Sequence, residues 1–333
     1  MNKLTVSLSP HVHSGDSVSK NMYGVLIALV PALLCSFVYF GLGAILVTLV
    51  SVASCVFFEW AINKYMLKRN DTSVLDGSAI LTGVLLAFNV PSNIPLWMVM
   101  VGALFAIGVV KMTFGGLGCN LFNPALAGRA FMLISFPVAM TTWPKPLQGF
   151  FNLDAETGAT PLALMKQVIK GGDQGVVAAA DLAKTDFLSM FTGNTGGCMG
   201  EVCEIALLIG LCYMLYKKII TWHIPVSIIG TVFVFAGILY LCNPTSFPDP
   251  RLDIVSGGLM LGAIFMATDY VTSPMSKSGQ LVYGVAIGFL TVVIRTWGAY
   301  PEGMSFAILI MNAFVPLINN YFKPKRFGEV VKK

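Results

Sequence analysis

A threonine hydroxyl in a polar segment is the first candidate for chemistry. Thr160 follows Gly158 and Ala159, and these small neighbours leave its hydroxyl open to a large group that approaches or becomes attached. The segment lies within residues 141–200, the one long stretch of the chain that is not intensely apolar. The same residues are also typical of a turn that leads into a helix, because Pro161 is well placed at a first helical position. Spacing alone leaves both interpretations open.

Two acidic residues lie at the ends of short apolar segments. Asp76 precedes the segment 79–89, and Asp269 closes the segment 254–269. A carboxylate inside a bilayer is costly and commonly belongs to an ion or proton path. Asp76 could equally cap a helix, since a Gly-Ser pair follows it. Both acids are therefore candidates for an ion path. Three other acids are expected to be ordinary helix-end charges at headgroup depth: Glu59, Glu201 and Glu204.

A third candidate is the run from Asn123 to Arg129, which follows the glycine-rich turn 114–118. Glycines allow close backbone approach, and a helix N-terminus with an arginine could hold an anionic or carbonyl-bearing ring system. Arg129 could instead extend along its helix to the cytoplasmic headgroups. The sequence thus makes Asn123 and Arg129 candidate contacts for a ligand.

The composition is that of a polytopic membrane protein. Of 333 residues, 56% are hydrophobic and 11% are charged, against about 25% charged in a soluble domain. The net charge of +5 comes from Lys and Arg residues in short loops at span ends, so it does not indicate nucleic-acid binding. Seven cysteines without a Cys-x-x-Cys pair predict no metal or iron–sulfur site within the chain. The roles of Cys119, Cys198 and Cys203 stay open.

Apolar runs long enough for a bilayer predict an all-α fold with about ten transmembrane helices. Two of the runs, near 79 and 254, are short and begin at glycines, which predicts broken or half-spanning helices. The ten runs are Met22–Phe40, Gly43–Trp60, Ala79–Asn89, Leu96–Val110, Phe122–Met140, Val202–Tyr216, Pro225–Cys242, Ile254–Asp269, Leu281–Arg295 and Ser305–Asn319.

An internal repeat divides the chain. Residues 76–89 align with residues 256–269 at an offset of 180, and Gly77/Gly257, Leu81/Leu261 and Ala87/Ala267 are identical pairs. Five spans per repeat would make the two halves inverted, which is an architecture of transporters and channels. The alternative is chance similarity between two segments rich in Ala, Gly and Leu. We expect membrane repeats at 1–140 and 201–322, a loop at 141–200, and a basic tail at 323–333.

The positive charges predict the orientation in the membrane. With ten spans, nearly all loops that are rich in Lys and Arg fall on one side, and such loops are cytoplasmic. Both termini are then cytoplasmic. The loop 141–200 is then extracytoplasmic, because long translocated loops are exempt from the charge rule.

The segment Asp154-x-x-Thr157-Gly158-Ala159-Thr160 resembles the flavinylation motif Asp-x-x-[Ser/Thr]-[Gly/Ala]-Ala-[Ser/Thr], in which a dedicated transferase attaches FMN through its phosphate to the last hydroxyl. Nearly the whole chain is similar to the D subunits of Rnf (also called Rsx) ion-translocating ferredoxin:NAD oxidoreductases, and more distantly to the B subunit of the sodium-pumping NADH:quinone reductase. The likeness includes Leu8-Ser9-Pro10-His11, Asp76-Gly77-Ser78-Ala79, Phe114-Gly115-Gly116-Leu117-Gly118, Asn123-Pro124-Ala125-Leu126-Ala127-Gly128-Arg129, Ala267-Thr268-Asp269 and Tyr300-Pro301-Glu302-Gly303.

This resemblance implies a flavoprotein subunit that is not active alone. It implies covalent FMN on Thr160, and it leaves open a second, non-covalent flavin (riboflavin) between the repeats. The expected fold is similar to urea transporters, and the expected location is the bacterial inner membrane. The expected partners are the A, B, C, E and G subunits of the complex and, during maturation, the flavin transferase. The work of the complex would be to couple ferredoxin/NAD redox chemistry to translocation of Na⁺ or H⁺.

Two other functions compete with electron transfer. The inverted repeat alone would suit a solute channel or a secondary transporter, and a structural membrane anchor is a further alternative. The flavinylation motif separates these functions, because a channel has no use for it.

Overall fold

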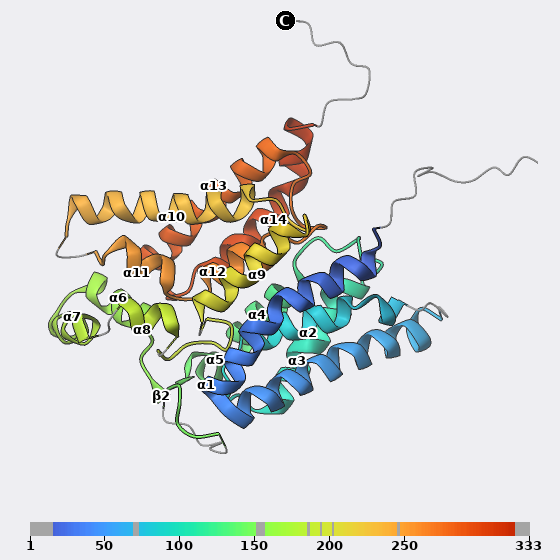
Figure 1. Cartoon of the computed structure of the whole chain (residues 1–333), viewed down its shortest axis with the longest axis horizontal. Coiled ribbons are helices and arrows are strands. Elements are labelled where there is room, and N and C mark those ends of the chain that lie inside the picture. Colours follow the sequence, from blue (N-terminus) through green and yellow to red (C-terminus); the bar gives the residue numbers. More distant parts are fainter. Residues whose placement is uncertain are drawn as a thin grey trace, which may run out of the picture.

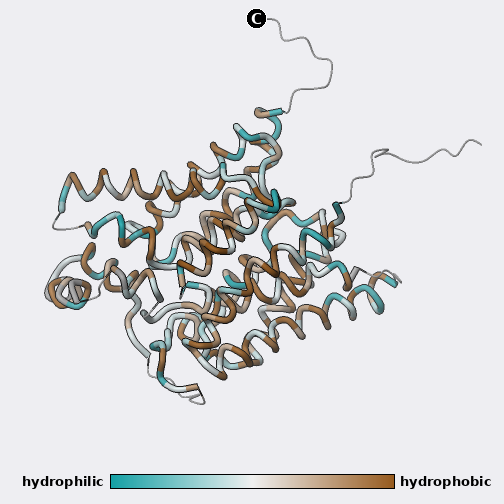
Figure 2. Tube along the Cα trace, in the orientation of Figure 1, coloured by the Kyte–Doolittle hydropathy of each residue, from teal (hydrophilic) through white to brown (hydrophobic). Residues whose placement is uncertain are grey.

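The computed structural model describes residues 16–68, 73–150, 157–184, 187–193, 195–201, 203–244 and 247–323. Asp154 and the tail beyond Lys323 lie outside these residues. The described part is mostly helical, with one pair of two-residue strands (Figure 1). Hydrophobic residues run along the helices, and hydrophilic residues gather toward their ends (Figure 2).

The first long helix, α1 (Val18–Ala61), consists of two limbs that fold back on each other (Figure 1). The break is at Gly41, whose φ of 60° favours glycine. A Cβ at this position would lie 2.5 Å from the carbonyl oxygen of Phe150. The same oxygen accepts a hydrogen bond from the N–H of Leu42 at 2.9 Å. The first two predicted spans are therefore helical, and the turn between them is tied to the loop that follows α5.

Both short segments are confirmed as short helices. Helix α2 covers Ser78–Phe88 and rises about 17 Å, roughly half of a bilayer core of about 30 Å. The second segment is broken: α11 (Pro250–Val255) ends before Ser256, and α12 (Leu259–Leu261) continues into the π-helix η4 (Gly262–Met266). The prediction of a broken or half-spanning helix at 254–269 is therefore confirmed as a broken helix. Residues 259–266 are all buried, so this helix does not have to cover the full thickness of the lipid.

Four helices in the described part are long and apolar enough to cross a membrane: α1 with its π-helical extension η1 (Ile62–Met66), α10 (His223–Cys242), α13 (Lys277–Trp297) and α14 (Met304–Tyr321). Shorter apolar helices accompany them: α3 (Leu96–Leu104) with η3 (Phe105–Met112), α4 (Pro124–Ser135) and α9 (Glu204–Tyr216). The chain is therefore a helical, multi-pass membrane protein. The count of ten spans and the inverted repeat stay predictions.

One expected span is interrupted. The segment predicted at 122–140 forms α4 and then the short helix α5 (Pro137–Thr141), with Phe136 between them outside helical geometry. Pro137 explains the break, because proline disfavours helical backbone at the residue before it.

The remaining packing joins the two halves of the chain: α1 packs on α9, and α4 packs on both α2 and α14. A single apolar core includes residues of both halves.

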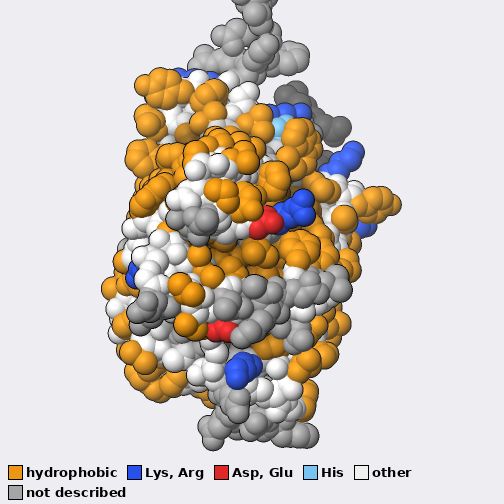
Figure 3. Space-filling view, turned by 90° about the vertical axis from the view of Figure 1, so that its left-hand side faces the viewer, with side chains coloured by type: hydrophobic (Ala, Val, Ile, Leu, Met, Phe, Trp, Pro, Cys, Tyr) orange, Lys and Arg blue, Asp and Glu red, His pale blue; other side chains and the backbone are white. Residues whose placement is uncertain are grey.

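The loop 141–200, in which the sequence predicted a turn into a helix at Pro161, contains two strands and three helices among its described residues. Strands β1 (Trp143–Pro144) and β2 (Thr157–Gly158) pair antiparallel, and three helices follow: α6 (Pro161–Lys170), α7 (Asp173–Lys184) and α8 (Phe187–Thr192). Helices α6 and α7 lie at the left in Figure 1, away from the start of α1 and the end of α14. The face on this side exposes many apolar and few charged side chains (Figure 3).

Candidate functional site

Thr160 lies where the strand pair meets α6. It is the N-cap of α6, and its Oγ1 accepts a hydrogen bond from the N–H of Ala163 at 3.1 Å. Pro161 occupies the first helical turn, so the predicted turn into a helix is confirmed. Thr157 and Ala159 are exposed, whereas Thr160 is 8% exposed. The motif thus presents its last hydroxyl inward, at the positive end of a helix.

Two adjoining cavities, here called the Thr160 cavities, meet at this residue. One has a free volume of about 560 Å³ and is lined by Arg129, Trp143, Tyr300 and Glu302, among others. The other has about 500 Å³ and is bordered by Glu201 and by the break between α11 and α12. Trp143, Thr160 and Glu302 line both. The site therefore combines aromatic walls with buried charge.

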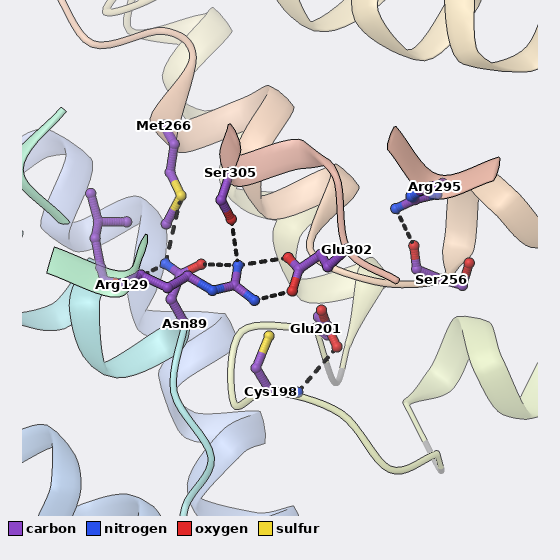
Figure 4. A network of polar contacts seen from close by, with 10 residues as sticks. Asn89, Arg129, Cys198, Glu201, Ser256, Met266, Arg295, Glu302 and Ser305 are labelled. Carbon is purple, nitrogen blue, oxygen red and sulfur yellow. Dashed lines mark hydrogen bonds and ion pairs between the residues drawn. The ribbon is translucent and has the colours of Figure 1, made fainter. Parts of the chain in front are cut away.

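Arg129 and Glu302 form a buried ion pair at the wall of these cavities (Figure 4). Arg129 is 4% exposed. Its Nη1 donates to Glu302 Oε1 at 2.6 Å, to Ser305 Oγ at 2.8 Å and to Asn89 Oδ1 at 3.0 Å, and its Nη2 donates to Glu302 Oε2. The alternative that Arg129 extends to the headgroups is therefore wrong. Glu302 was not among the predicted site residues, although its Tyr-Pro-Glu-Gly motif belonged to the family resemblance.

The break between α11 and α12 passes between this ion pair and a second arginine. A Cβ added at Gly258 would lie 2.8 Å from Glu302 Oε1, so only glycine fits beside the pair. On the other side, Arg295 donates from Nη2 to the carbonyl of Ser256 at 2.9 Å and from Nη1 to the carbonyl of Asp253 at 2.6 Å. Arg295 thus holds the backbone of this segment through charge-assisted hydrogen bonds, at the border of a Thr160 cavity.

Lys166 of α6 connects the loop to the same wall. Its Nζ donates to the carbonyl oxygens of Gly298 and Tyr300 at 2.6 and 2.7 Å. Burial lowers the pKa of Lys166, and the positive charge of nearby Lys170 lowers it further. The lysine therefore anchors α6 over the cavities and is not a free counter-ion for a bound phosphate.

Asn123 belongs to a different cavity from Arg129. Asn123 caps α4: its Oδ1 accepts from the N–H groups of Ala125 and Leu126, and its Nδ2 donates to the carbonyl of Met266 at 3.2 Å. It lines a cavity with a free volume of about 780 Å³, here called the Asp269 cavity. The other polar residues of its lining are Asn21, Ser78, Thr82, Lys111, Asn120, Thr268, Asp269 and Tyr270. The structure thus assigns the two candidate contacts of α4 to two separate cavities.

Asp269 lies in the lining of the Asp269 cavity, and Asp76 lies next to it. Asp269 lines the cavity, and its Oδ2 accepts from Thr272 Oγ1 at 3.1 Å. Asp76 Oδ1 accepts from the N–H and the hydroxyl of Ser78 at 2.8 and 2.5 Å, so the capping interaction considered for it is present. Ser78 itself lines the cavity. The structure thus brings both candidate acids to the region of one cavity.

A buried ion pair that the sequence did not suggest lies beside Asp76. Lys111 Nζ donates to Glu59 Oε2 at 2.7 Å and to Ser78 Oγ at 2.6 Å, and both charged side chains are 2% exposed. Glu59 is therefore not a headgroup-level charge, and Lys111 is not a solvated loop cation. The sequence signal that could have revealed this pair is that acidic Glu59 and basic Lys111 each lie at the end of an apolar run.

Glu201 and Glu204 also differ from the prediction of helix-end charges at headgroup depth. Glu201 Oε2 accepts from the N–H of Cys198 at 3.1 Å, and Glu201 borders a Thr160 cavity. Glu204, at the start of α9, is 1% exposed. Glu204 is therefore buried, and Glu201 is half-buried at a cavity wall.

A family model matches nearly the whole chain. The model of the NQR2, RnfD, RnfE family matches residues 5–328. The chain belongs to this family. The resemblance predicted from the motifs is thereby confirmed.

Individual relatives in the family match over almost their full length. The D subunit of the Na⁺-translocating ferredoxin:NAD⁺ oxidoreductase complex of Acetobacterium woodii is 45% identical over 98% of this chain and 95% of the relative. The proton-translocating counterpart of Clostridium ljungdahlii is 41% identical over 98% and 97%. The D subunit of an ion-translocating oxidoreductase complex of Aliivibrio salmonicida is 36% identical over 97% and 98%. Because close relatives are named for different ions, overall similarity does not identify the ion.

Proposed function

We propose that this chain is the D subunit of an ion-translocating ferredoxin:NAD oxidoreductase complex and that it relays electrons through FMN attached to Thr160. The names of its relatives support the complex and its redox-driven ion transport. The observation that carries the flavin assignment is the position of Thr160, where the motif's last hydroxyl caps a helix at the junction of two cavities.

The residues around Thr160 fit a flavin phosphodiester. A phosphate on Oγ1 would lie at the N-terminus of α6, where the helix dipole and backbone N–H groups favour an anion. Trp143 and Tyr300 offer aromatic surface for a ring system. Arg129 Nε is a buried donor without a partner among the described residues, and an isoalloxazine carries acceptor atoms. FMN would supply one- and two-electron transfer, while these residues bind it and exclude water.

The Asp269 cavity supports a second, non-covalent flavin such as riboflavin. It lies between the halves of the chain, and the side chains of Asn120 and Asn123 lie in its lining beside apolar surface. Amide groups both donate and accept hydrogen bonds, as an uncharged isoalloxazine requires.

Asp76 and Asp269 are proposed to serve the ion path at this end of the protein, because a carboxylate buried in a membrane protein commonly marks such a path.

We place the chain in the bacterial inner membrane with cytoplasmic termini and the Thr160 loop outside. The wide separation of α6 and α7 from the start of α1 and the end of α14 supports this orientation (Figure 1). The proposed partners are the A, B, C, E and G subunits and, during maturation, the flavin transferase. We also propose ten spans in two inverted, urea-transporter-like repeats, with α2 and the α12–η4 segment as equivalent central elements.

The test replaces Thr160 with alanine. We expect Thr160→Ala to lose one FMN mass from the intact subunit and to abolish ultraviolet fluorescence of the denatured band. Thr157→Ser is the matched control, because Thr157 is exposed and serine keeps the hydroxyl that the motif requires at this position; it should keep the flavin on Thr160. Flavin retained by Thr160→Ala would contradict the assignment. A dark band from parental protein, made in a host with the transferase, would favour a channel, a transporter or a structural anchor.

A further inference from the structure

Glu204 is a buried carboxyl group that none of the proposed roles uses. It is the first residue of α9, and it is 1% exposed. Among the residues that the structure describes, neither of its carboxyl oxygens has a hydrogen-bond partner. The helix N-terminus favours an anion, but it does not replace the hydrogen bonds that a carboxylate loses on leaving water. An ionised Glu204 would therefore be strongly disfavoured.

The charges around Glu204 do not neutralise it. The groups that interact with it electrostatically are Glu201 and Cys203 from its own segment and Arg295 from α13. Arg295 is already engaged, since it donates to the carbonyls of Asp253 and Ser256 and pairs with the Asp253 carboxylate at 3.5 Å. The second buried arginine of this region is paired with Glu302. Within the part of the chain that the structure describes, Glu201 and Glu204 therefore have no cation of their own.

Glu201 connects this buried acid to a cavity. Its Oε2 accepts from the Cys198 N–H, and its side chain borders the Thr160 cavity near the α11–α12 break (Figure 4). The two acids are three positions apart in sequence, and Glu201 is the less buried of the pair. A proton that leaves Glu204 therefore has an acceptor that faces the cavity.

We propose that Glu204 holds a proton in the folded protein and exchanges it with Glu201, so that the pair is a proton-binding site that opens into the Thr160 cavity. In the exchange, the O–H bond of Glu204 breaks and one forms on Glu201, while the pair keeps a single negative charge. A sodium ion is a poorer occupant, because a hard cation requires several oxygen ligands and the described residues contain no group of three or more His, Cys, Asp or Glu side chains that could hold a metal.

The pair also responds to charge in the cavity. When the Thr160 cavity takes up an electron, as the proposed function requires, the added negative charge favours the proton on Glu201, which lies at the cavity wall. Oxidation reverses this preference. The structure therefore assigns to the pair a redox-linked movement of one proton, whereas the resting protonation of Glu204 does not depend on any flavin.

The test is infrared spectroscopy of the purified complex at neutral pH. We expect the parental protein to show the carbonyl stretch of one protonated carboxyl that Glu204→Gln loses and that Glu204→Asp shifts. In Glu201→Gln the band should persist. The exchange of the Glu204 carboxyl proton for deuterium in D₂O should slow by about tenfold or more, which is equivalent to about 1.4 kcal/mol in barrier height. Assembly of each variant is checked by size-exclusion chromatography, and the Asp variant serves if the Gln variant does not assemble.

Three outcomes would overturn the proposal. A spectrum unchanged by either substitution at Glu204 would mean that Glu204 is ionised. Exchange at the parental rate in Glu201→Gln would mean that the proton does not leave through Glu201. A band that appears only after removal of Na⁺ would identify a sodium site instead. Loss of flavin from Thr160 would refute the proposed function but would leave the resting band of Glu204 in place, so the two failures are distinguishable.

Discussion

Removing the positive charge of Lys111 should destabilise the protein strongly. Lys111→Met deletes the ammonium group that contacts Glu59 at 2.7 Å and Ser78 at 2.6 Å, and it leaves Glu59, which is 2% exposed, without its cation. Glu59 lies on the second limb of α1 and Lys111 on η3, so the pair holds two apolar elements together where each meets the Asp76 end of α2.

The size of the effect follows from burial. Breaking a buried ion pair by removing one partner costs about 3–5 kcal/mol, because the remaining charge is desolvated and unpaired. Replacing both partners with neutral groups of similar shape is commonly close to neutral. We therefore expect the double variant Glu59→Gln/Lys111→Met to be more stable than Lys111→Met alone, with a coupling free energy of about 3 kcal/mol. Ser78 keeps Asp76 as an acceptor in both variants.

The assay is SDS-induced unfolding of the purified protein in mixed micelles, followed by tryptophan fluorescence. Lys20→Met is the matched control, because its ion pair with Asp16 joins side chains that are 64% and 71% exposed; such surface pairs contribute about 0–1 kcal/mol. If Lys111→Met unfolds at the same SDS fraction as the Lys20 variant, or if the double variant is no more stable than Lys111→Met, the pair does not have the energetic role that its burial implies.

Four further substitutions test the topology, the ion path and the α1 turn. Val176→Cys, at a position 73% exposed on α7, should react with a membrane-impermeant maleimide in intact spheroplasts, and labelling only after lysis would invert the orientation. Asp76→Asn and Asp269→Asn should assemble and carry FMN but lose ion-dependent turnover; pumping at the parental rate by both would make the acids structural. Gly41→Ala should cost at least about 1 kcal/mol in unfolding free energy, from positive φ and the clash with Phe150, and wild-type stability would show that the turn can relax.

The amino-acid sequence by itself determined the membrane class, the approximate positions of the helices and the two short segments. These properties depend on local composition and on run length against bilayer thickness. The turn at Thr160 was predictable for a similar reason, because Pro161 fixes a helix start within a few residues. The interruption at Phe136 was missed even though its cause, Pro137, is local.

Only the tertiary structure decided which charges meet. Arg129 pairs with a glutamate 173 positions away, and Lys111 pairs with one 52 positions away. Composition and spacing alone do not show whether a charge at the end of an apolar run reaches the headgroups or turns inward, because that depends on which neighbouring helices enclose it. For the same reason Asn123 and Arg129, six residues apart on one helix, line two different cavities.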